Sequence, residues 1–386
     1  MSLLGVASAA ALVVWGAERQ RGADAEAKGR EVRGVWIWGQ SVSAEGAEAT
    51  AERLAAHGVN AALLLVKGVS GRVAYPSRLA PRAYPDGDLL RDFLAACQRR
   101  HIQTHAWFIF NTDNAYGRAH PSEVMYSAGR SGAWDEGYSP IAPKGDSVGI
   151  CPASEGYRAY FKELVGEVLQ GYPVDGIHLD CIRYPHITYC FCPRHQEKAR
   201  KRGIKLERVR QALYRTLAAP DRDRTYYFRR YAAGDPDITA WVRMRDEEIA
   251  QMVREVRDLV RAKGPNVRLS AAFMPEGAED DPTTALCHYA QNYETSGALL
   301  DFVIPMSYHV SYGQSAAWPA QLAEKAARRA GVPAYAGIQA FPSKAGVDAA
   351  AAAQEAVAAV RQQGVPGFFC FRYGTLPAAA WKSVLD

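Results

Sequence analysis

The sequence predicts an α/β protein with a (β/α)₈ barrel fold and long insertions after the third and fourth strands. Two observations carry this prediction. After residue 31, eight β-like runs alternate with eight helical runs, which is the pattern of a closed barrel. A doubly wound sheet usually has a phosphate-binding glycine fingerprint near its first strand, and the spacing of Gly34 and Gly39 does not match one. A length of 386 residues suits one large barrel domain over 31–386.

The predicted strands are short runs that are rich in branched and aromatic residues and are bounded by Gly, Pro, Asn or Asp. They span residues 32–39, 60–66, 102–110, 174–181, 267–274, 301–308, 334–341 and 367–373.

The predicted helices lie between these strands and have apolar residues at helical spacing. Asp88, for example, precedes such a run and is a typical N-cap. The helices span residues 47–57, 88–100, 155–170, 238–263, 282–297, 316–330, 345–363 and 377–385.

Two connections, 111–153 and 186–237, are too long to be simple loops. Both leave the carboxyl ends of strands, where barrel enzymes build their sites, so we expect them to form walls or lids. The second contains a basic stretch over 194–215, which indicates a solvated helix face, a surface that attracts an anionic glycan, or a nucleic-acid surface. The net charge of only +5 argues against a dedicated nucleic-acid binder, so we expect no nucleic-acid partner.

The first 30 residues resemble a targeting segment. Residues 3–17 are small or apolar and residues 18–30 are polar, which is typical of a signal peptide or an N-terminal anchor followed by a linker. Ala23-Asp24-Ala25 offers a cleavage pattern, and a cytoplasmic tail is the alternative interpretation. We therefore expect a protein that is secreted or associated with the cell envelope. We also expect a monomer.

The fourth predicted strand carries the candidate catalytic group. Side chains alternate between the two faces of a strand, so Ile177 and Leu179 should face the outer helices. Gly176, His178 and Asp180 should then point into the barrel. An inward carboxylate is costly unless it reaches the open mouth or is paired, and Asp180 comes at the carboxyl end of the strand. The alternative is a structural Asp that binds loop amides.

Other strand ends add polar and aromatic side chains to the same rim. Aromatic faces commonly stack on sugar rings, so these residues predict a sugar-binding cleft in which Arg183 orients the carboxylates. With His178, the predicted substrate-binding residues are Trp36, Trp38, Lys67, His105, Trp107, Asn111, Arg183, Tyr184, Tyr308 and Tyr373.

Hydrolysis of a glycosidic bond needs a second carboxylate. Glu276 is the best candidate because it follows the fifth strand, next to the strand of Asp180. The alternatives on neighbouring loops, each of which also suits a cap or a solvated side chain, are Asp113, Asp280, Asp281 and Glu294.

Several segments resemble the glycosyl hydrolase-like 10 family of bacterial barrel proteins. They are VRGVW at 32–36, the Tyr-Pro-Ser run at 75–77 with Pro81, the segment 88–108, VDGIHLDCIRYP at 174–185, LDFVIPMSY at 300–308, and 367–373. The resemblance implies a (β/α)₈ glycosidase that acts on cell-envelope polysaccharide, with peptidoglycan glycan strands as a known substrate class, and it implies no catalytic metal. The chain departs from the family in two places: Cys181 follows Asp180 where relatives often have Asp or Tyr, and Gln291-Asn292-Tyr293 replaces a common Gln-Asp-Trp.

We expect no cofactor and no metal in the catalytic site. A metal-dependent barrel hydrolase needs inward His and Asp residues on several strands, and only His105, His178 and Asp180 qualify. Outside that site, Cys190-x-Cys192-x-x-His195 leaves three interpretations open. The motif could bind zinc with Cys181 or His186 as the fourth ligand, form a disulfide, or consist of free thiols.

These observations predict a glycosidase that cleaves a bacterial cell-envelope polysaccharide. Asp180 acts as nucleophile or electrostatic stabiliser, and Glu276 as general acid/base. The competing hypothesis is a non-catalytic glycan-binding barrel that keeps the aromatic rim but has no carboxylate pair.

Overall fold

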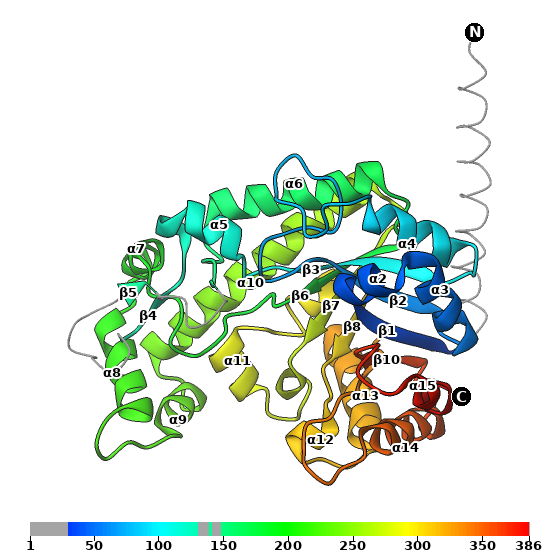
Figure 1. Ribbon diagram of the computed structural model, residues 1–386. Helices are drawn as coiled ribbons and strands as arrows, with labels where there is room; N and C mark the ends of the chain where they lie inside the picture. Colours follow the sequence, from blue (N-terminus) through cyan, green and yellow to red (C-terminus); the bar gives the residue numbers. More distant parts are fainter. Residues whose placement is uncertain (1–29, 130–138, 141–147, 386) are drawn as a thin grey trace.

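Eight parallel strands form a nearly closed barrel in the computed structural model, which describes residues 30–129, 139–140 and 148–385 (Figure 1). In hydrogen-bonded order the strands are β8 (Phe302–Pro305), β7 (Arg268–Phe273), β6 (Gly176–Asp180), β3 (Gln103–Ile109), β2 (Ala61–Lys67), β1 (Val32–Trp38), β10 (Gly367–Phe371) and β9 (Ala336–Gln339). A parallel bridge between Val303 and Ala334 joins the two ends of the sheet. The predicted barrel is therefore confirmed, with each predicted strand present.

Helices surround the barrel and follow the strands in the predicted alternation (Figure 1). They are α3 (Ala47–Ala56), α4 (Leu89–Gln98), α6 (Glu155–Gly171), α10 (Pro236–Lys263), α11 (Thr283–Tyr289), α13 (Trp318–Ala330), α14 (Ala349–Gln362) and α15 (Ala378–Leu385). Helix α11 is much shorter than the predicted helix over 282–297, because Ala290 adopts a left-handed conformation and ends it. Gln291 then turns toward the barrel, where its side chain accepts from the Met274 amide and donates to the Ala272 carbonyl.

Side chains of the strands divide between two hydrophobic cores. Trp36, Trp107 and Phe302 belong to a cluster inside the barrel, whereas Ile177 and Leu179 belong to the larger cluster between sheet and helices. The alternation predicted for β6 is thus observed. Gly176 is required there, because a Cβ at this position would lie 2.2 Å from the His105 ring. Because Gly176 on β6 has no side chain, the His105 ring on β3 has the space it needs.

The two insertions build a smaller unit beside the carboxyl ends of the strands, on the left of Figure 1. Its elements are α5 (Asn114–Ala119), a 3₁₀ turn (Pro121–Glu123), β4 (Tyr126–Ser127), β5 (Ser139–Pro140), α7 (Pro193–Lys201), α8 (Leu206–Leu217) and α9 (Tyr226–Ala232). The first half of α10 packs against them and contributes Trp241 and Met244 to a separate hydrophobic cluster with Phe191 and Leu213. The insertions therefore have a core of their own.

Three short elements complete the rim: α2 (Gly39–Glu45), a 3₁₀ turn (Pro275–Gly277) and α12 (His309–Tyr312). In the part of the chain that the structure describes, none of the helices combines the length and hydropathy needed to cross a bilayer. The predicted targeting segment and most of its linker lie outside the described residues.

Candidate active site

Asp180 is the last residue of β6 and reaches the carboxyl end of the barrel. Its Oδ2 accepts a hydrogen bond from Trp107 Nε1 at 3.2 Å, and Oδ1 lies 3.7 Å from Arg183 Nη1. Cys181, with φ of 54°, turns its amide back to donate to Oδ1 at 2.6 Å. A single loop amide therefore contacts this carboxylate, and its other partners are side chains of the site. About 9% of the residue stays exposed, so the carboxylate is held firmly yet can be reached from the mouth.

His178 lies beneath Asp180 and is fully buried. Trp36 Nε1 donates to its Nε2 at 3.2 Å, so the proton sits on Nδ1 and is donated to Ser270 Oγ at 2.9 Å. Burial lowers the pKa of His178 to about 3, which leaves the ring neutral at ordinary pH. His105 lies deeper still, where it packs edge-on against Phe302 at 5.7 Å. Trp36, His105 and His178 are thus buried beneath Asp180 and form the floor of the site.

An aromatic wall rises above this floor. The Tyr308 ring lies 5.6 Å from both Phe341 and Phe371, and the Trp107 ring lies 6.3 Å from Phe371. Burial, together with the charge of Asp180, raises the pKa of Tyr308 well above its usual value, so its hydroxyl remains a hydrogen-bond donor. Trp38 stands at the end of β1, where the Arg372 guanidinium covers its ring at 3.5 Å.

Asn111 holds the backbone of Arg183 in place, because its Nδ2 donates a hydrogen bond to the Arg183 carbonyl oxygen at 3.0 Å. Burial favours a lower pKa for this guanidinium, but electrostatic interactions with its neighbours, among them Cys181 and the Asp180 carboxylate, outweigh the effect of burial and hold the pKa above its usual value. Among the described residues, its buried Nη1 has no hydrogen-bond partner. Arg183 therefore presents a fixed positive charge and a spare donor beside Asp180.

Glu276 lies in the 3₁₀ turn that follows β7, the strand paired with β6. Its Oε1 accepts from the Tyr312 hydroxyl at 3.2 Å, while its Oε2 is buried and has no hydrogen-bond partner within the described ranges. Burial and then the charge of Glu276 raise the pKa values of Tyr289 and Tyr312, and the charge of Arg183 lowers both. The charges of Glu276 and Arg183 therefore have opposite effects on the pKa values of the same two tyrosines.

The other candidate carboxylates have structural partners. Each caps a turn or helix or belongs to an ion pair, so at least one of its oxygens has a partner within the protein. Asp113 pairs with Lys67, Asp280 with Lys325 and Glu294 with Arg329, and Asp281 accepts from the amide of Thr283. Among the five carboxylates considered, Glu276 combines a position directly after β7 with a buried oxygen that has no hydrogen-bond or ion-pair partner among the described residues.

Three predicted substrate-binding residues lie away from the mouth. Lys67 has no exposed surface, and its ammonium contacts Asp113 at 3.0 Å, two backbone carbonyls and the Tyr157 hydroxyl. Tyr184 is fully buried and turns its hydroxyl into the insertions. Tyr373 bonds to His57 Nδ1 at 3.2 Å and packs against the ring of Trp381. All three side chains are buried and bonded within the protein, so in this structure they do not reach a ligand at the mouth.

Sequence reasoning missed Tyr289 and Tyr312, the two tyrosines beside Glu276. Tyr312 follows Tyr308 by one helical turn, a spacing that could have indicated a shared surface. Tyr289 had no such signal, since its place depends on the early end of α11.

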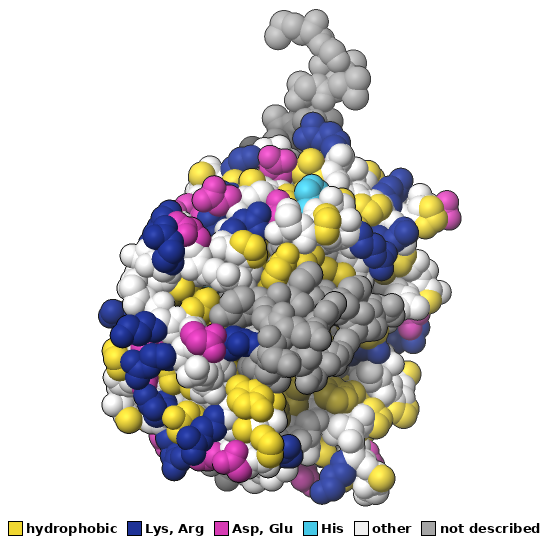
Figure 2. Space-filling view, turned by 90° about the vertical axis from the view of Figure 1, so that its left-hand side faces the viewer, with side chains coloured by type: hydrophobic (Ala, Val, Ile, Leu, Met, Phe, Trp, Pro, Cys, Tyr) yellow, Lys and Arg dark blue, Asp and Glu magenta, His cyan; other side chains and the backbone are white. Residues whose placement is uncertain are grey.

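The basic stretch over 194–215 forms α7 and α8 and is largely neutralised by acidic neighbours. Figure 2, which looks onto this side of the molecule, shows Lys and Arg intermixed with Asp and Glu. The ion pairs are Lys198–Glu248, Arg200–Glu197, Lys201–Glu197, Arg202–Glu247, Arg208–Asp237 and Arg210–Glu207. This pairing favours the solvated-face interpretation over a surface for anionic polymers.

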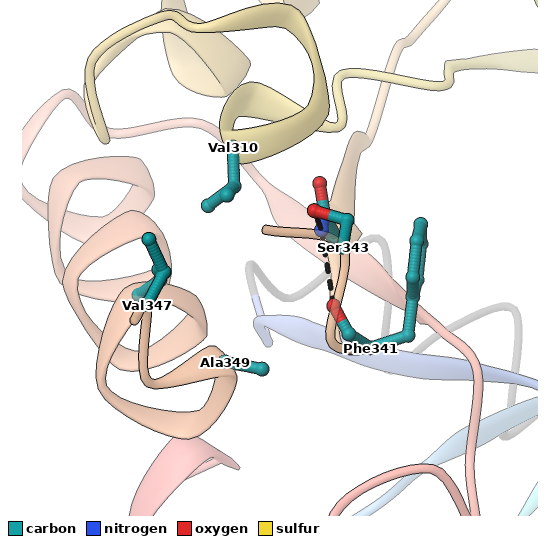
Figure 3. Close-up of a pocket in the computed structure, with 7 residues that line it drawn as sticks. Val310, Phe341, Ser343, Val347 and Ala349 are labelled. Carbon is teal, nitrogen blue, oxygen red and sulfur yellow. Dashed lines mark hydrogen bonds between the residues drawn. The ribbon is translucent and has the colours of Figure 1, made fainter. Parts of the chain in front are cut away.

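A small pocket near α12 and α14 offers little for a ligand (Figure 3). Gln339 is its main polar group, and its amide donates to Phe341 O and Ser343 Oγ. Its Oε1 accepts from the Ser311 amide and hydroxyl, both at 3.0 Å. With these bonds made internally, the pocket is a feature of packing.

Comparisons with solved structures agree with the fold. The PgaB (BpsB) glycoside hydrolase domain from Bordetella bronchiseptica covers 92% of this chain with 99% of its own, at 15% identity and a TM-score of 0.67. A β-galactosidase from Marinomonas ef1 covers 92% of this chain with 58% of its own, at 12% identity and a TM-score of 0.63. At such low identity these likenesses establish a shared barrel architecture.

Sequence comparisons go further. An S-layer-related protein from Niallia circulans is 28% identical over 246 residues, a match that spans 56% of this chain and 14% of that much longer protein. The sequence profile of the family described as glycosyl hydrolase-like 10 matches residues 31–349, which is most of the chain. With the barrel and the carboxylate at its mouth in place, the chain belongs to the glycosyl hydrolase-like 10 family.

Proposed function

We propose that this protein is a glycosidase that cleaves a bacterial cell-envelope polysaccharide, with the glycan strand of peptidoglycan or a related amino-sugar polymer as substrate. One observation carries the proposal: Asp180 stands at the carboxyl end of β6, exposed by 9% and held between Trp107 and Arg183. Barrel enzymes place their catalytic groups at this end. Family membership supports hydrolysis, and the S-layer-related relative supports an envelope location, which the predicted targeting segment would explain.

Asp180 is the carboxylate that stabilises or attacks the anomeric carbon. The Trp107 and Cys181 hydrogen bonds fix its orientation, so that its position does not depend on the substrate. Arg183 places a positive charge beside it and has a donor available for a sugar hydroxyl or for the leaving group.

Glu276 is the general acid/base of the proposed reaction. It follows the neighbouring strand, and its Oε1 is held by Tyr312, which leaves the buried Oε2 to exchange a proton with the glycosidic oxygen. General acid/base groups of this kind typically contribute about 10²- to 10⁴-fold in rate.

The aromatic wall supplies affinity for the sugar. Phe371 contacts both Trp107 and Tyr308, so a pyranose ring over Asp180 can stack on apolar faces while its hydroxyls meet polar edges. A glycan-binding barrel without catalysis would use the same wall and would not need Glu276.

The test is product analysis after incubation of the full chain with intact, peptide-free and deacetylated wall glycans. We expect new reducing ends from at least one of these polymers and none from the Asp180→Asn variant. Binding of a glycan with no product from any of the three would instead favour the non-catalytic barrel.

A further inference from the structure

Four buried side chains of the two insertions converge beside the barrel. They are Cys151, at the end of the first insertion, and Cys190, Cys192 and His195 in the second. One ligand atom of each lies within 4.8 Å of all the others. The Cys151 and Cys192 sulfurs are 3.4 Å apart, and His195 Nδ1 lies 3.4 Å from the first and 3.3 Å from the second.

These distances match the coordination shell of zinc. With Zn–S bonds of about 2.3 Å and Zn–N bonds of about 2.0 Å, a tetrahedral site spaces its ligand atoms by roughly 3.5 to 3.8 Å. Three thiols and one imidazole are a standard ligand set for a structural zinc ion. Cys151 is the fourth member of the cluster, whereas Cys181 and His186, the residues suggested by spacing, do not belong to it: the His186 ring bonds to Thr188.

Groups around the cluster orient its ligands. Tyr184 bonds to His195 Nε2 at 2.8 Å, which leaves Nδ1 facing the three sulfurs. The Tyr126 amide donates to Cys190 Sγ at 3.4 Å, as backbone amides do to metal-bound thiolates. The buried Arg245 guanidinium lies 4.4 Å from the centre of the Tyr184 ring. Outer contacts of this kind fix the tautomer and direction of metal ligands.

We propose that Cys151, Cys190, Cys192 and His195 bind a structural zinc ion that fastens the two insertions to each other. All four positions of a tetrahedral ion would be filled by protein and the ligands are buried, so no position remains for a water or a substrate. The site is separate from the proposed hydrolysis at Asp180 and does not depend on it.

The ion would also stabilise the segment that carries part of the candidate active site. Residues 181–192 run from Asp180 to the cluster and include Arg183. A disulfide is the competing arrangement, and all seven cysteines are free in the structure. Closing one between Cys151 and Cys192 would require their sulfurs to approach from 3.4 Å to about 2.05 Å.

Metal analysis of the untagged full chain, purified without chelator, tests the proposal directly. We expect about one zinc ion per chain, loss of that zinc in the Cys192→Ser variant, and full retention in Cys97→Ser. Cys97 is an equally buried thiol on α4, remote from the insertions, and serves as the matched control. Cobalt exchanged into the native protein should show the visible bands of tetrahedral thiolate coordination.

The native measurement decides the matter even if the variant fails to fold. A folded native chain with no bound zinc after exposure to zinc salts would overturn the proposal, and so would a Cys192→Ser variant that keeps its zinc. Alkylation of the unfolded, unreduced and metal-free chain gives an independent answer. Seven labelled thiols are expected, whereas two fewer would reveal a disulfide and overturn it.

Discussion

Polar side chains have different partners at the two ends of the barrel. At the amino end, residues just before a strand accept hydrogen bonds from the backbone amide of the neighbouring strand. Asn60 accepts from Arg33, Asp175 from Thr104, and Asp301 from Leu269, at 2.8, 2.8 and 2.7 Å. These side chains give hydrogen-bond partners to backbone amides at the amino end of the barrel, so they serve the fold.

At the carboxyl end the side chains mostly meet one another. Asp180 is held by Trp107 and Arg183, and Glu276 by Tyr312, while one buried atom of Arg183 and one of Glu276 have no hydrogen-bond partner among the described residues. Buried groups left unsatisfied are costly unless a ligand completes them. Asp175 directly precedes β6 and Asp180 ends it, and only their surroundings distinguish a structural carboxylate from a candidate catalytic one.

The largest effect is expected from Asp180→Asn. Asn keeps the shape and can still accept from Trp107, but it has no negative charge for the anomeric carbon. We expect kcat/KM to fall by about 10³-fold or more, with little change in Tm. Steady-state kinetics on the cleaved glycan measure the fall, and unchanged kinetics would place the chemistry on another residue.

Lys67→Met sharpens the comparison by showing that one polar group at the carboxyl end is structural. The substitution leaves the Asp113 carboxylate buried without its counter-charge, so the free energy of unfolding should drop by about 3 kcal/mol or more. Urea denaturation measures the drop. Lys325→Met is the control, since its partners Glu279 and Asp280 keep contact with solvent, and its cost should stay below about 1 kcal/mol.

Glu276→Gln should slow hydrolysis by about 100-fold on natural glycans. An activated aryl glycoside, whose leaving group needs no proton, should be affected much less. Glu279→Gln is the matched control, because this residue follows three positions later and instead bonds to Trp318 and Lys325. Equal losses on both kinds of substrate would remove Glu276 from the role of general acid.

Asp175→Ala should produce the smallest effect, and on stability alone. Losing the bond to the Thr104 amide should lower the free energy of unfolding by about 1 kcal/mol, while kcat stays near the native value. Chemical denaturation and kinetics on the same preparations measure both quantities. A large loss of kcat at native stability would contradict the division between the two ends.

Local patterns predicted the strands and the direction of Asp180, because alternation within a strand depends on the backbone alone. The directions of Lys67, Tyr184 and Tyr373 were not predictable in this way, since each lies at or beyond a strand end where tertiary contacts decide. The early end of α11 has the same origin: contacts of Gln291 with β7 turned a helical pattern into a bend. Cys151 was missed because its partners lie in the other insertion.

Counting the reducing ends that the native chain and Asp180→Asn release from one glycan, with binding of that glycan measured in parallel, tests the central claim most directly. The account predicts that both proteins bind the polymer and that only the native chain cuts it. If the variant cuts at the native rate, or if the native chain binds without cutting, the carboxylate at the end of β6 does not carry the reaction.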